Sequence, residues 1–309
     1  MKNEKLQIKI GGLVFKNPIW VASGTFGTGE ELKDFLDLST VGAIVTKTVT
    51  LQAREGNPPP RVVETPSGML NSIGLENKGA AYFIKEHLPG LKRTGTRVIA
   101  SVAGTSVKDL VECAVKIMNA KDKPDAIELN LSCPNVSYGE TKYKLLAQDP
   151  EMAEKTVKIV KKEIKEMVIV KLSPNVTDIT EIARAAEAGG ADAVAMINTY
   201  MGIAVDARGK RPILGNIIGG LSGPAIKPLA LRAVWESHKK INIPIIGIGG
   251  IMSGEDAAEF MLCGASAVEI GTANLVSPDA HKRILGEFEE YLAECGIERA
   301  EDLIGAMGV

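Results

Sequence analysis

The sequence predicts a TIM barrel, an α/β fold in which eight parallel strands close into a barrel and helices cover its outside. Short apolar runs alternate with helical patterns along most of the chain, as expected of a parallel sheet. Eight such runs are present, and 309 residues are close to the length of a barrel. An open, doubly wound sheet is the alternative, but the even spacing of the runs favours closure. Because no linker or shift in composition divides the chain, we expect a single domain over residues 1–309.

The expected strands are short and mainly apolar, and several of them end in a polar residue or a glycine. They cover residues 18–22, 43–48, 97–102, 126–131, 168–172, 193–197, 245–248 and 267–270. A small hairpin over residues 6–15, turning at Gly11 and Gly12, precedes them. We expect this N-terminal hairpin to plug or cap the barrel.

The expected helices follow the strands and carry apolar residues at helical spacing. They cover residues 30–38, 76–88, 107–119, 150–166, 179–188, 227–239, 254–263, 280–294 and 299–304. Two excursions interrupt the alternation: residues 50–74 contain three consecutive prolines, and residues 200–224 are rich in glycine. We expect both excursions as inserted loops at the C-terminal mouth of the barrel, where the strand-to-helix loops of this fold lie.

Composition and charge exclude several classes of protein. The net charge is −2 and no basic run is present, which argues against a nucleic-acid partner. Residues 1–9 are charged and alternating, unlike a signal peptide, and no apolar run is long enough to span a membrane. We therefore expect a cytoplasmic protein with no membrane partner.

The four cysteines, Cys113, Cys133, Cys263 and Cys295, are far apart and form no C-x-x-C pair. This spacing argues against a disulfide framework, a zinc site or an iron–sulfur cluster, and we expect no metal in this chain. Cys113 and Cys263 lie in apolar helical patterns and are expected in the core. Cys133 instead follows a strand, directly before Pro134, which ends that strand because proline has no N–H for the ladder. A lone cysteine is more often a core residue, but a thiol at a strand end beneath a polar loop also suits proton transfer at a ligand.

The C-terminal ends of all barrel strands face one mouth, so residues distant in the sequence are expected to meet there. Two of them, Lys47 and Lys171, end apolar strands, and a buried lysine is costly unless it meets an anion or acceptors. The alternative is that each lysine reaches solvent at the barrel rim. The residues expected at the mouth are Ser23, Lys47, Asn130, Cys133, Lys171, Asn198, Thr199, Gly249, Gly250, Gly271 and Thr272.

The last two strands end in glycines, at Gly249-Gly250 and Gly271-Thr272, which predicts a phosphate site where barrel enzymes commonly hold one. Residues 253–256, SGED, fit a capping box, so the N–H groups of the following helix are expected to point toward this site. A dinucleotide-binding reading of residues 247–252 fails, because Met252 occupies the third glycine position of G-x-G-x-x-G. The chain therefore has no visible NAD fingerprint.

Three motifs carry a resemblance to a known family: NSIGL at residues 71–75, NLSCPN at residues 130–135 and IGGIMSG at residues 248–254. With them, and along nearly its whole length, the sequence resembles class 1 dihydroorotate dehydrogenases, the flavin enzymes of pyrimidine synthesis. Within class 1 it is most similar to the NAD-linked class 1B catalytic subunit. Cys133 in place of a serine base, and no N-terminal membrane-anchoring helix, argue against class 2.

The resemblance implies an FMN cofactor and a dihydroorotate site. The residues implied to hold FMN are Ser23, Lys47, Thr48, Ser101, Asn130, Lys171, Ile197, Gly223, Gly249, Gly250, Gly271 and Thr272. The residues implied to hold dihydroorotate are Lys47, Asn71, Ser72, Ile73, Gly74, Leu75, Asn130, Asn135, Asn198 and Thr199. Lys171 would lie near the pyrimidine edge of the flavin. Ser101 occupies a place where NAD-linked members often carry a flavin-contacting asparagine. Cys133 would be the base that removes the C5 proton while the C6 hydride passes to flavin N5.

The family also implies a partner, since this chain has neither an NAD fingerprint nor a cysteine cluster. Electrons would pass from FMN through an electron-transfer subunit with FAD and a 2Fe-2S cluster to NAD, in a heterotetramer of two catalytic and two electron-transfer chains. The resulting reaction is the oxidation of dihydroorotate to orotate in de novo UMP biosynthesis. The alternatives are a fumarate-linked class 1A enzyme, a related FMN dihydropyrimidine dehydrogenase and, in a different class, a non-catalytic sensor of a phosphate ligand.

Overall fold

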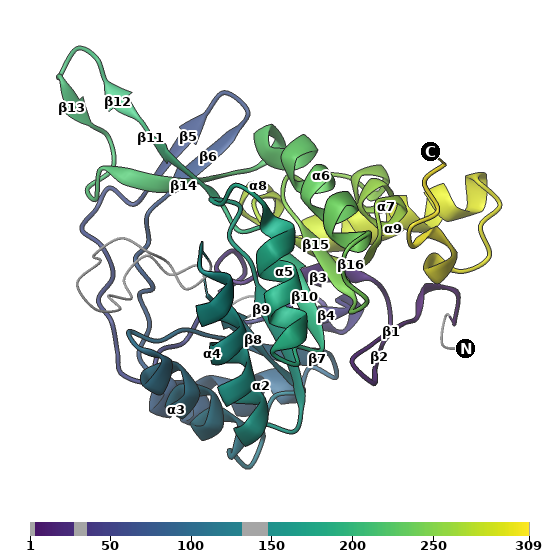
Figure 1. Cartoon of the computed structure of the whole chain (residues 1–309). Helices are drawn as coiled ribbons and strands as arrows, with labels where there is room; N and C mark the ends of the chain where they lie inside the picture. The colour runs from purple at the N-terminus through teal and green to yellow at the C-terminus, as the bar shows by residue number, and fades with distance from the viewer. Residues whose placement is uncertain (1–3, 28–35, 132–147, 309) are drawn as a thin grey trace.

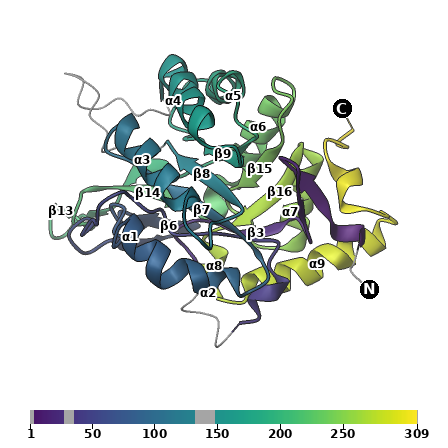
Figure 2. The same cartoon turned by 90° about the horizontal axis from the view of Figure 1, so that it is seen from below.

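The computed structural model describes residues 4–27, 36–131 and 148–308. The predicted barrel is confirmed: eight parallel strands close into a ring, in an order that follows the chain, with helices around it (Figures 1 and 2). These strands are β3 (Ile19–Val21), β4 (Ala43–Val45), β7 (Arg97–Val102), β8 (Ala126–Asn130), β9 (Met167–Lys171), β10 (Ala193–Met196), β15 (Ile245–Ile248) and β16 (Ala265–Ile270). That a single domain spans residues 1–309 stays a prediction.

The barrel strands are buried on both faces, which explains why they read as apolar runs. Ile99 and Ile169 pack inside the barrel, whereas Val98 and Val168 pack outward with the helices, and all four are fully buried. Burial on both faces is typical of parallel sheets covered by helices.

The N-terminal hairpin acts as a plug, as expected. Its strands β1 (Ile8–Ile10) and β2 (Leu13–Phe15) pair antiparallel and contribute buried side chains to the cluster inside the barrel. The ring of Phe15 lies 4.4 Å from that of Trp20 on the first barrel strand, measured between centroids. The turn needs glycine at Gly11, because its φ is +55° and a Cβ there would lie 2.8 Å from the side chain of Met167. One end of the barrel is therefore filled, and the opposite end is left for a ligand.

Helices follow most of the strands, as the sequence predicts, and none in the described ranges is long and apolar enough to cross a membrane. The helix expected over residues 30–38 lies largely outside the described residues, and Leu38–Thr40 forms a 3-10 turn. The α-helices are α1 (Ala80–Tyr82), α2 (Leu88–Lys92), α3 (Val107–Met118), α4 (Pro150–Glu163), α5 (Ile179–Ala188), α6 (Lys227–His238), α7 (Gly254–Leu262), α8 (Ala273–Val276) and α9 (Ala280–Glu294). Further single turns of 3-10 helix are Glu4–Leu6, Pro224–Ile226 and Ala300–Leu303.

The helix expected over residues 76–88 begins later, at Ala80, and continues through a π-helical turn, Phe83–His87, into α2. Asn77 explains the late start, because its side-chain oxygen accepts from the N–H of Gly79 at 2.8 Å and closes a turn. Gly79 has a φ of 84°, outside the helical region.

The two excursions are not loops alone, which corrects the expectation. Their strands form a four-stranded antiparallel sheet, in the order β11-β14-β6-β5, which projects from the barrel beside the ribbon β12-β13 (Figure 1). The strands are β5 (Val62–Thr65), β6 (Gly68–Asn71), β11 (Tyr200–Ile203), β12 (Val205–Asp206), β13 (Arg211–Pro212) and β14 (Ile218–Ser222). Close packing requires the glycines: a Cβ on Gly219 would lie 2.8 Å from the Asn71 carbonyl oxygen, and one on Gly220 would lie 2.1 Å from Thr199 Oγ1.

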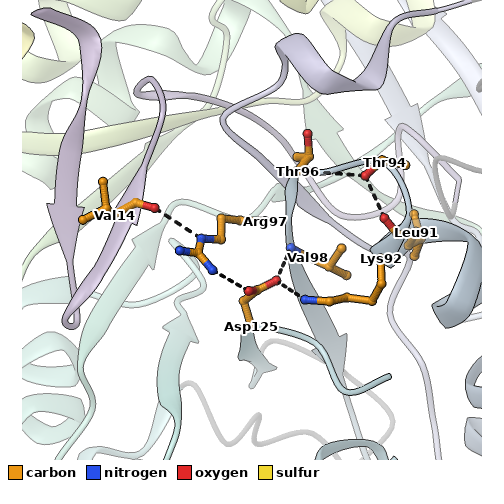
Figure 3. A network of polar contacts seen from close by, with 8 residues as sticks. All are labelled: Val14, Leu91, Lys92, Thr94, Thr96, Arg97, Val98 and Asp125. Atoms are coloured by element: carbon orange, nitrogen blue, oxygen red, sulfur yellow. Dashed lines mark hydrogen bonds and ion pairs between the residues drawn. The ribbon is translucent and has the colours of Figure 1, made fainter. Parts of the chain in front are cut away.

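At the strand N-terminal ends, Asp125 gathers a network of polar contacts (Figure 3). Its carboxylate accepts from Arg97 Nη1 at 2.7 Å, Lys92 Nζ at 2.8 Å and the N–H of Val98 at 2.9 Å. Arg97 also donates to the carbonyl of Val14 in the hairpin plug, at 3.2 Å. Burial favours a raised pKa for Asp125, but these three donors outweigh it and lower the pKa below its ordinary value. The network thus ties two strands, a helix and the plug together.

Replacing Asp125 with asparagine should lower the free energy of unfolding by roughly 1–3 kcal/mol at neutral pH, because two cations and an N–H lose their anionic acceptor. A carboxylate with a lowered folded-state pKa stabilises the fold above its unfolded pKa, about 3.9, and this stability is lost as the pH falls through the folded pKa. Urea unfolding at pH 7 and pH 3 should therefore give a smaller difference between variant and wild type at pH 3. Asp122→Asn, an exposed neighbour, is the control. Equal stability of wild type and Asp125→Asn at pH 7 would refute the role of the network.

Candidate functional site

A cavity of about 410 Å³ lies at the C-terminal ends of the barrel strands, where the sequence places the site. Its volume falls in the range of ligand pockets, about 300–1,000 Å³. Most of the predicted site residues line it: Ser23, Lys47, Thr48, Asn71, Ser72, Ile73, Gly74, Leu75, Asn130, Lys171, Ile197, Asn198, Thr199, Gly223, Gly249, Gly250, Gly271 and Thr272. Cys133 and Asn135 lie outside the described residues. Ser101 is fully buried and does not line the cavity.

Thr48 gathers a hydroxyl network on the cavity wall. Its Oγ1 lies 3.0 Å from Ser101 Oγ and 3.1 Å from Ser23 Oγ, and it accepts from Asn130 Nδ2 at 3.2 Å. Three strand ends, β3, β7 and β8, are linked in this way to the segment after β4. Ser101 therefore acts on the cavity through Thr48.

Another part of the wall is the loop over residues 72–75, which contacts from both excursions hold in place. Ser72 Oγ accepts from Asn57 Nδ2 at 2.9 Å and from Asn216 Nδ2 at 3.2 Å. Leu75 has a φ of 57°, a left-handed conformation that costs a side-chain-bearing residue energy. Asn77 Nδ2 donates to the Leu75 carbonyl at 2.8 Å and helps to fix this conformation. Asn57 and Asn216 line the cavity and were not predicted, because no strand end marks them in the sequence.

Asn175 is a further cavity residue, and it is not among the residues predicted from the sequence. Its Nδ2 donates to the carbonyl of Thr199 at 2.9 Å, and its Oδ1 accepts from the N–H of Met201 at 2.9 Å. It therefore fixes the turn that presents Asn198 and Thr199. The sequence does contain a signal for Asn175, because this residue directly follows Pro174, shortly after the end of β9. Cys133 similarly stands next to Pro134, shortly after the end of β8.

The two lysines differ in their surroundings. Lys47 is half-buried in the cavity wall, and no side chain in the described part of the chain forms an ion pair or hydrogen bond with its ammonium group. It can therefore meet an anionic ligand. Lys171 is 5% exposed, which excludes the alternative that it reaches solvent, and its Nζ lies 3.6 Å from Glu269 Oε2. Burial favours a lowered pKa for Lys171, but the carboxylates of Glu128 and Glu269 raise it above its ordinary value.

The glycine-rich end of the cavity offers backbone N–H groups to an anion. Gly223, Gly249 and Gly250 have φ values of +94°, +130° and +75°, a region that favours glycine. A Cβ on Gly250 would lie 2.8 Å from Lys227 Cβ and 2.9 Å from the Gly223 carbonyl oxygen. Among the described residues, none accepts a hydrogen bond from the backbone N–H of Gly250 or Thr272. These donors fit a phosphate group, whose oxygens accept hydrogen bonds from backbone N–H groups.

The N-terminus of α7 does not fit the phosphate role expected for it. The capping box is present, with Ser253 as the N-cap. However, Asp256 Oδ2 accepts from the N–H groups of Met252, at 2.7 Å, and of Ser253, at 2.9 Å. Glu287 Oε2 accepts from the N–H of Gly254 at 2.8 Å. Carboxylates of the chain thus accept from the N–H groups of Met252, Ser253 and Gly254, which favours the loop glycines as the phosphate site.

A family model described as dihydroorotate dehydrogenase matches residues 5–292, nearly the whole of this chain. The chain belongs to the dihydroorotate dehydrogenase family. Its TIM barrel and the position of its cavity at the strand C-terminal ends agree with the resemblance in the sequence.

Curated dihydroorotate dehydrogenases match this chain over their full length. A relative from Bacteroides thetaiotaomicron is 51% identical over 304 residues, which cover 98% of this chain and 99% of the relative. One from Desulforamulus reducens is 51% identical over 301 residues, covering 97% and 98%. One from Geobacter sp. strain M21 is 47% identical over 307 residues, covering 99% of each. All three are named as the catalytic subunit of the NAD-linked B form, which confirms the predicted class 1B assignment and not the fumarate-linked alternative.

In this member of the dihydroorotate dehydrogenase family the cavity wall carries polar groups of several kinds. No group of three or more histidine, cysteine, aspartate or glutamate side chains in the described ranges could hold a metal ion. The cavity wall carries the ammonium group of Lys47, several amide and hydroxyl side chains, and the glycine-rich loops with their backbone N–H groups. These groups suit a carboxylate, a ring of amides and a phosphate, respectively.

Proposed function

We propose that this chain is the catalytic subunit of an NAD-linked dihydroorotate dehydrogenase, which oxidises dihydroorotate to orotate with FMN in de novo UMP biosynthesis. The observation that carries the proposal is that the barrel brings Lys47, the asparagines and the glycine-rich loops into the same cavity. Membership of the family supplies the reaction class. We place the enzyme in the cytoplasm.

FMN fits the inner part of the cavity. Its phosphate would lie at Gly223, Gly249, Gly250, Gly271 and Thr272, where backbone N–H groups are available. Ser23 and Thr48, which belong to the hydroxyl network, would face the isoalloxazine ring. The other residues proposed to line the ring are Asn130, Lys171 and Ile197. When bound, FMN supplies the hydride acceptor that the chain itself lacks.

Dihydroorotate fits the outer part, beneath the loop over residues 72–75. Lys47 would bind its carboxylate, and amide side chains would bind the ring, which has both donors and acceptors. The amides proposed for the ring are Asn71, Asn130, Asn135 and Asn198, with Thr199 beside them. Cys133 would accept the C5 proton as the C6 hydride leaves. Both Cys133 and Asn135 belong to the segment outside the described residues, so their roles follow from the family resemblance.

The relatives are named catalytic subunits, which implies that each works with another subunit. For this chain we propose an electron-transfer partner with FAD and a 2Fe-2S cluster, and an assembly of two catalytic and two electron-transfer chains. The sequence of this chain contains neither an NAD fingerprint nor a cluster-binding cysteine pattern. Electrons from FMN would therefore leave through the partner.

The isolated chain, loaded with FMN, should reduce an artificial dye with dihydroorotate but should not reduce NAD. Reduction of fumarate should be slow, because the relatives belong to the NAD-linked class. Anaerobic mixing with dihydroorotate, followed by each acceptor in turn, measures this from the flavin absorbance. If the chain binds FMN but dihydroorotate does not bleach the flavin absorbance, the proposed reaction is excluded. Rapid stoichiometric reduction of fumarate by the isolated chain would exclude the two-subunit pathway.

A further inference from the structure

Three ionisable side chains meet inside the barrel, below the cavity. Glu128 on β8 and Glu269 on β16 are fully buried, and Lys171 on β9 is 5% exposed. Lys171 lines the cavity, whereas the two glutamates do not. Glu269 is in register with Trp20 of β3 and Ile248 of β15, both of which pack in the interior cluster, so its side chain points into the barrel. The two carboxyl groups therefore lie behind Lys171 as seen from the ligand.

The charges of this group do not balance if both carboxyls are ionised. One ammonium group would face two carboxylates, and a buried unpaired charge is strongly unfavourable. Within the described part of the chain, no donor lies at normal hydrogen-bond distance from the four carboxyl oxygens. Lys171 Nζ is 3.6 Å from Glu269 Oε2, longer than a normal hydrogen bond. Burial, followed by the charge of Glu128, raises the pKa of Glu269 to about 8, although Lys171 acts to lower it. One proton on the pair brings the group to neutrality.

We propose that Glu128 and Glu269 form a buried acid pair that binds one proton and couples it, through Lys171, to the redox state of the cofactor in the cavity. The inference rests on the proposed function, because it requires FMN beside Lys171. With FMN held beside Lys171, hydride transfer to it would add one negative charge at this position. A negative charge near Lys171 raises the affinity of the pair for its proton, and by linkage the bound proton favours the reduced cofactor. The glutamates are positioning residues, since neither touches the ligand.

The pH dependence follows from the sign of this coupling. Among the described residues, the charged groups that act on Glu269 are Glu128 on β8 and Lys171 on β9. Below about pH 8 the pair keeps its proton and the three groups together are neutral. Above that pH the proton is lost, and one net negative charge remains beneath the cofactor. The midpoint potential of bound FMN should therefore fall more steeply with pH above this point than below it.

The proton itself can be measured without any redox reaction. Infrared spectra of the purified chain, with and without FMN, should contain the C=O stretch of a buried protonated carboxyl group at pH 7. The band should weaken as the pH rises through about 8. It should be lost in Glu269→Gln and in Glu128→Gln, each of which leaves one carboxylate opposite one lysine. Glu166→Gln, which removes a carboxylate paired with Lys123, is the control and should keep the band.

The coupling is tested by potentiometric titration of the FMN-loaded chain, with dithionite as the two-electron donor, between pH 6 and pH 10. Wild type and Glu166→Gln should show the steeper fall above about pH 8, and both acid-pair variants should lose it. If wild type has no protonated carboxyl band, the acid pair is refuted. If the band is present but the variants keep the wild-type pH profile, the coupling is refuted. If one of the two glutamine variants does not fold, the other variant tests the coupling. A wild-type chain that binds no FMN would refute the proposed function. The infrared band would still test the acid pair in that case.

Discussion

Replacing Cys133 with alanine should leave FMN and orotate bound but slow flavin reduction by dihydroorotate by roughly 10²–10⁴-fold, the usual loss when a general base is removed. The reason is that the C5 proton has no acceptor in the variant, although the hydride acceptor is still present. Stopped-flow absorbance of the flavin under anaerobic conditions measures the rate of this half-reaction. In wild type, the rate should rise with pH toward the thiol pKa, about 8.5 for an unperturbed cysteine.

A matched control separates a missing base from general damage by a lost thiol. Cys113 is fully buried against the barrel, and burial raises its pKa to about 12. Cys113→Ala should lose some stability but reduce its flavin at nearly the wild-type rate, with the same pH profile. A Cys133→Ala chain that reduces flavin at a near-normal rate would remove Cys133 from the mechanism.

Replacing Gly250 with glutamate should abolish FMN binding. The backbone there has a φ of +75°, and a Cβ would lie 2.8 Å from Lys227 Cβ, so the loop has to shift. The new carboxylate would also repel the phosphate that we propose at this loop. The absorbance spectrum of the purified chain gives the FMN content directly, and circular dichroism confirms that the chain is folded.

Gly12→Glu is the matched control for this change. Gly12 has a similar φ, +80°, but a Cβ there meets nothing within 4 Å, and it lies in the hairpin at the opposite end of the barrel. The control carries the same charge and the same backbone strain, so its FMN content should stay near that of wild type. Full FMN occupancy in Gly250→Glu would place the phosphate elsewhere.

The sequence is most informative where a single physical cause acts on every residue of an element. The barrel strands are buried on both faces and so appear as apolar runs, and their order along the chain gives the order in the barrel. The site is predictable for the same reason, because the topology brings Lys47, Lys171 and the glycines to one mouth whatever their distance in sequence.

The sheet formed by the two excursions could not be predicted, because its pairing is not local. Asn71 is in register with Gly220, 149 residues further along the chain, and its side-chain Nδ2 donates to the Gly220 carbonyl at 3.4 Å. Its glycines are needed for close packing, but in the sequence they indicate turns. The burial of Glu128 could not be predicted for a different reason. In the alternating pattern of residues 126–131 it occupies a position typical of an exposed polar face, whereas in the structure it is fully buried.

The closure of the barrel has a consequence for biosynthesis. The ring is completed by pairing between β16 and β3, where Val268 is in register with Ile19, so the first barrel strand made must wait for the last barrel strand. At about 5–20 residues per second, a ribosome needs roughly 15–60 s to complete 309 residues. During that time β3 keeps an unpaired edge, which can pair with other chains. Any truncation that removes β16 makes this transient state permanent, so such fragments should aggregate in place of forming a smaller barrel.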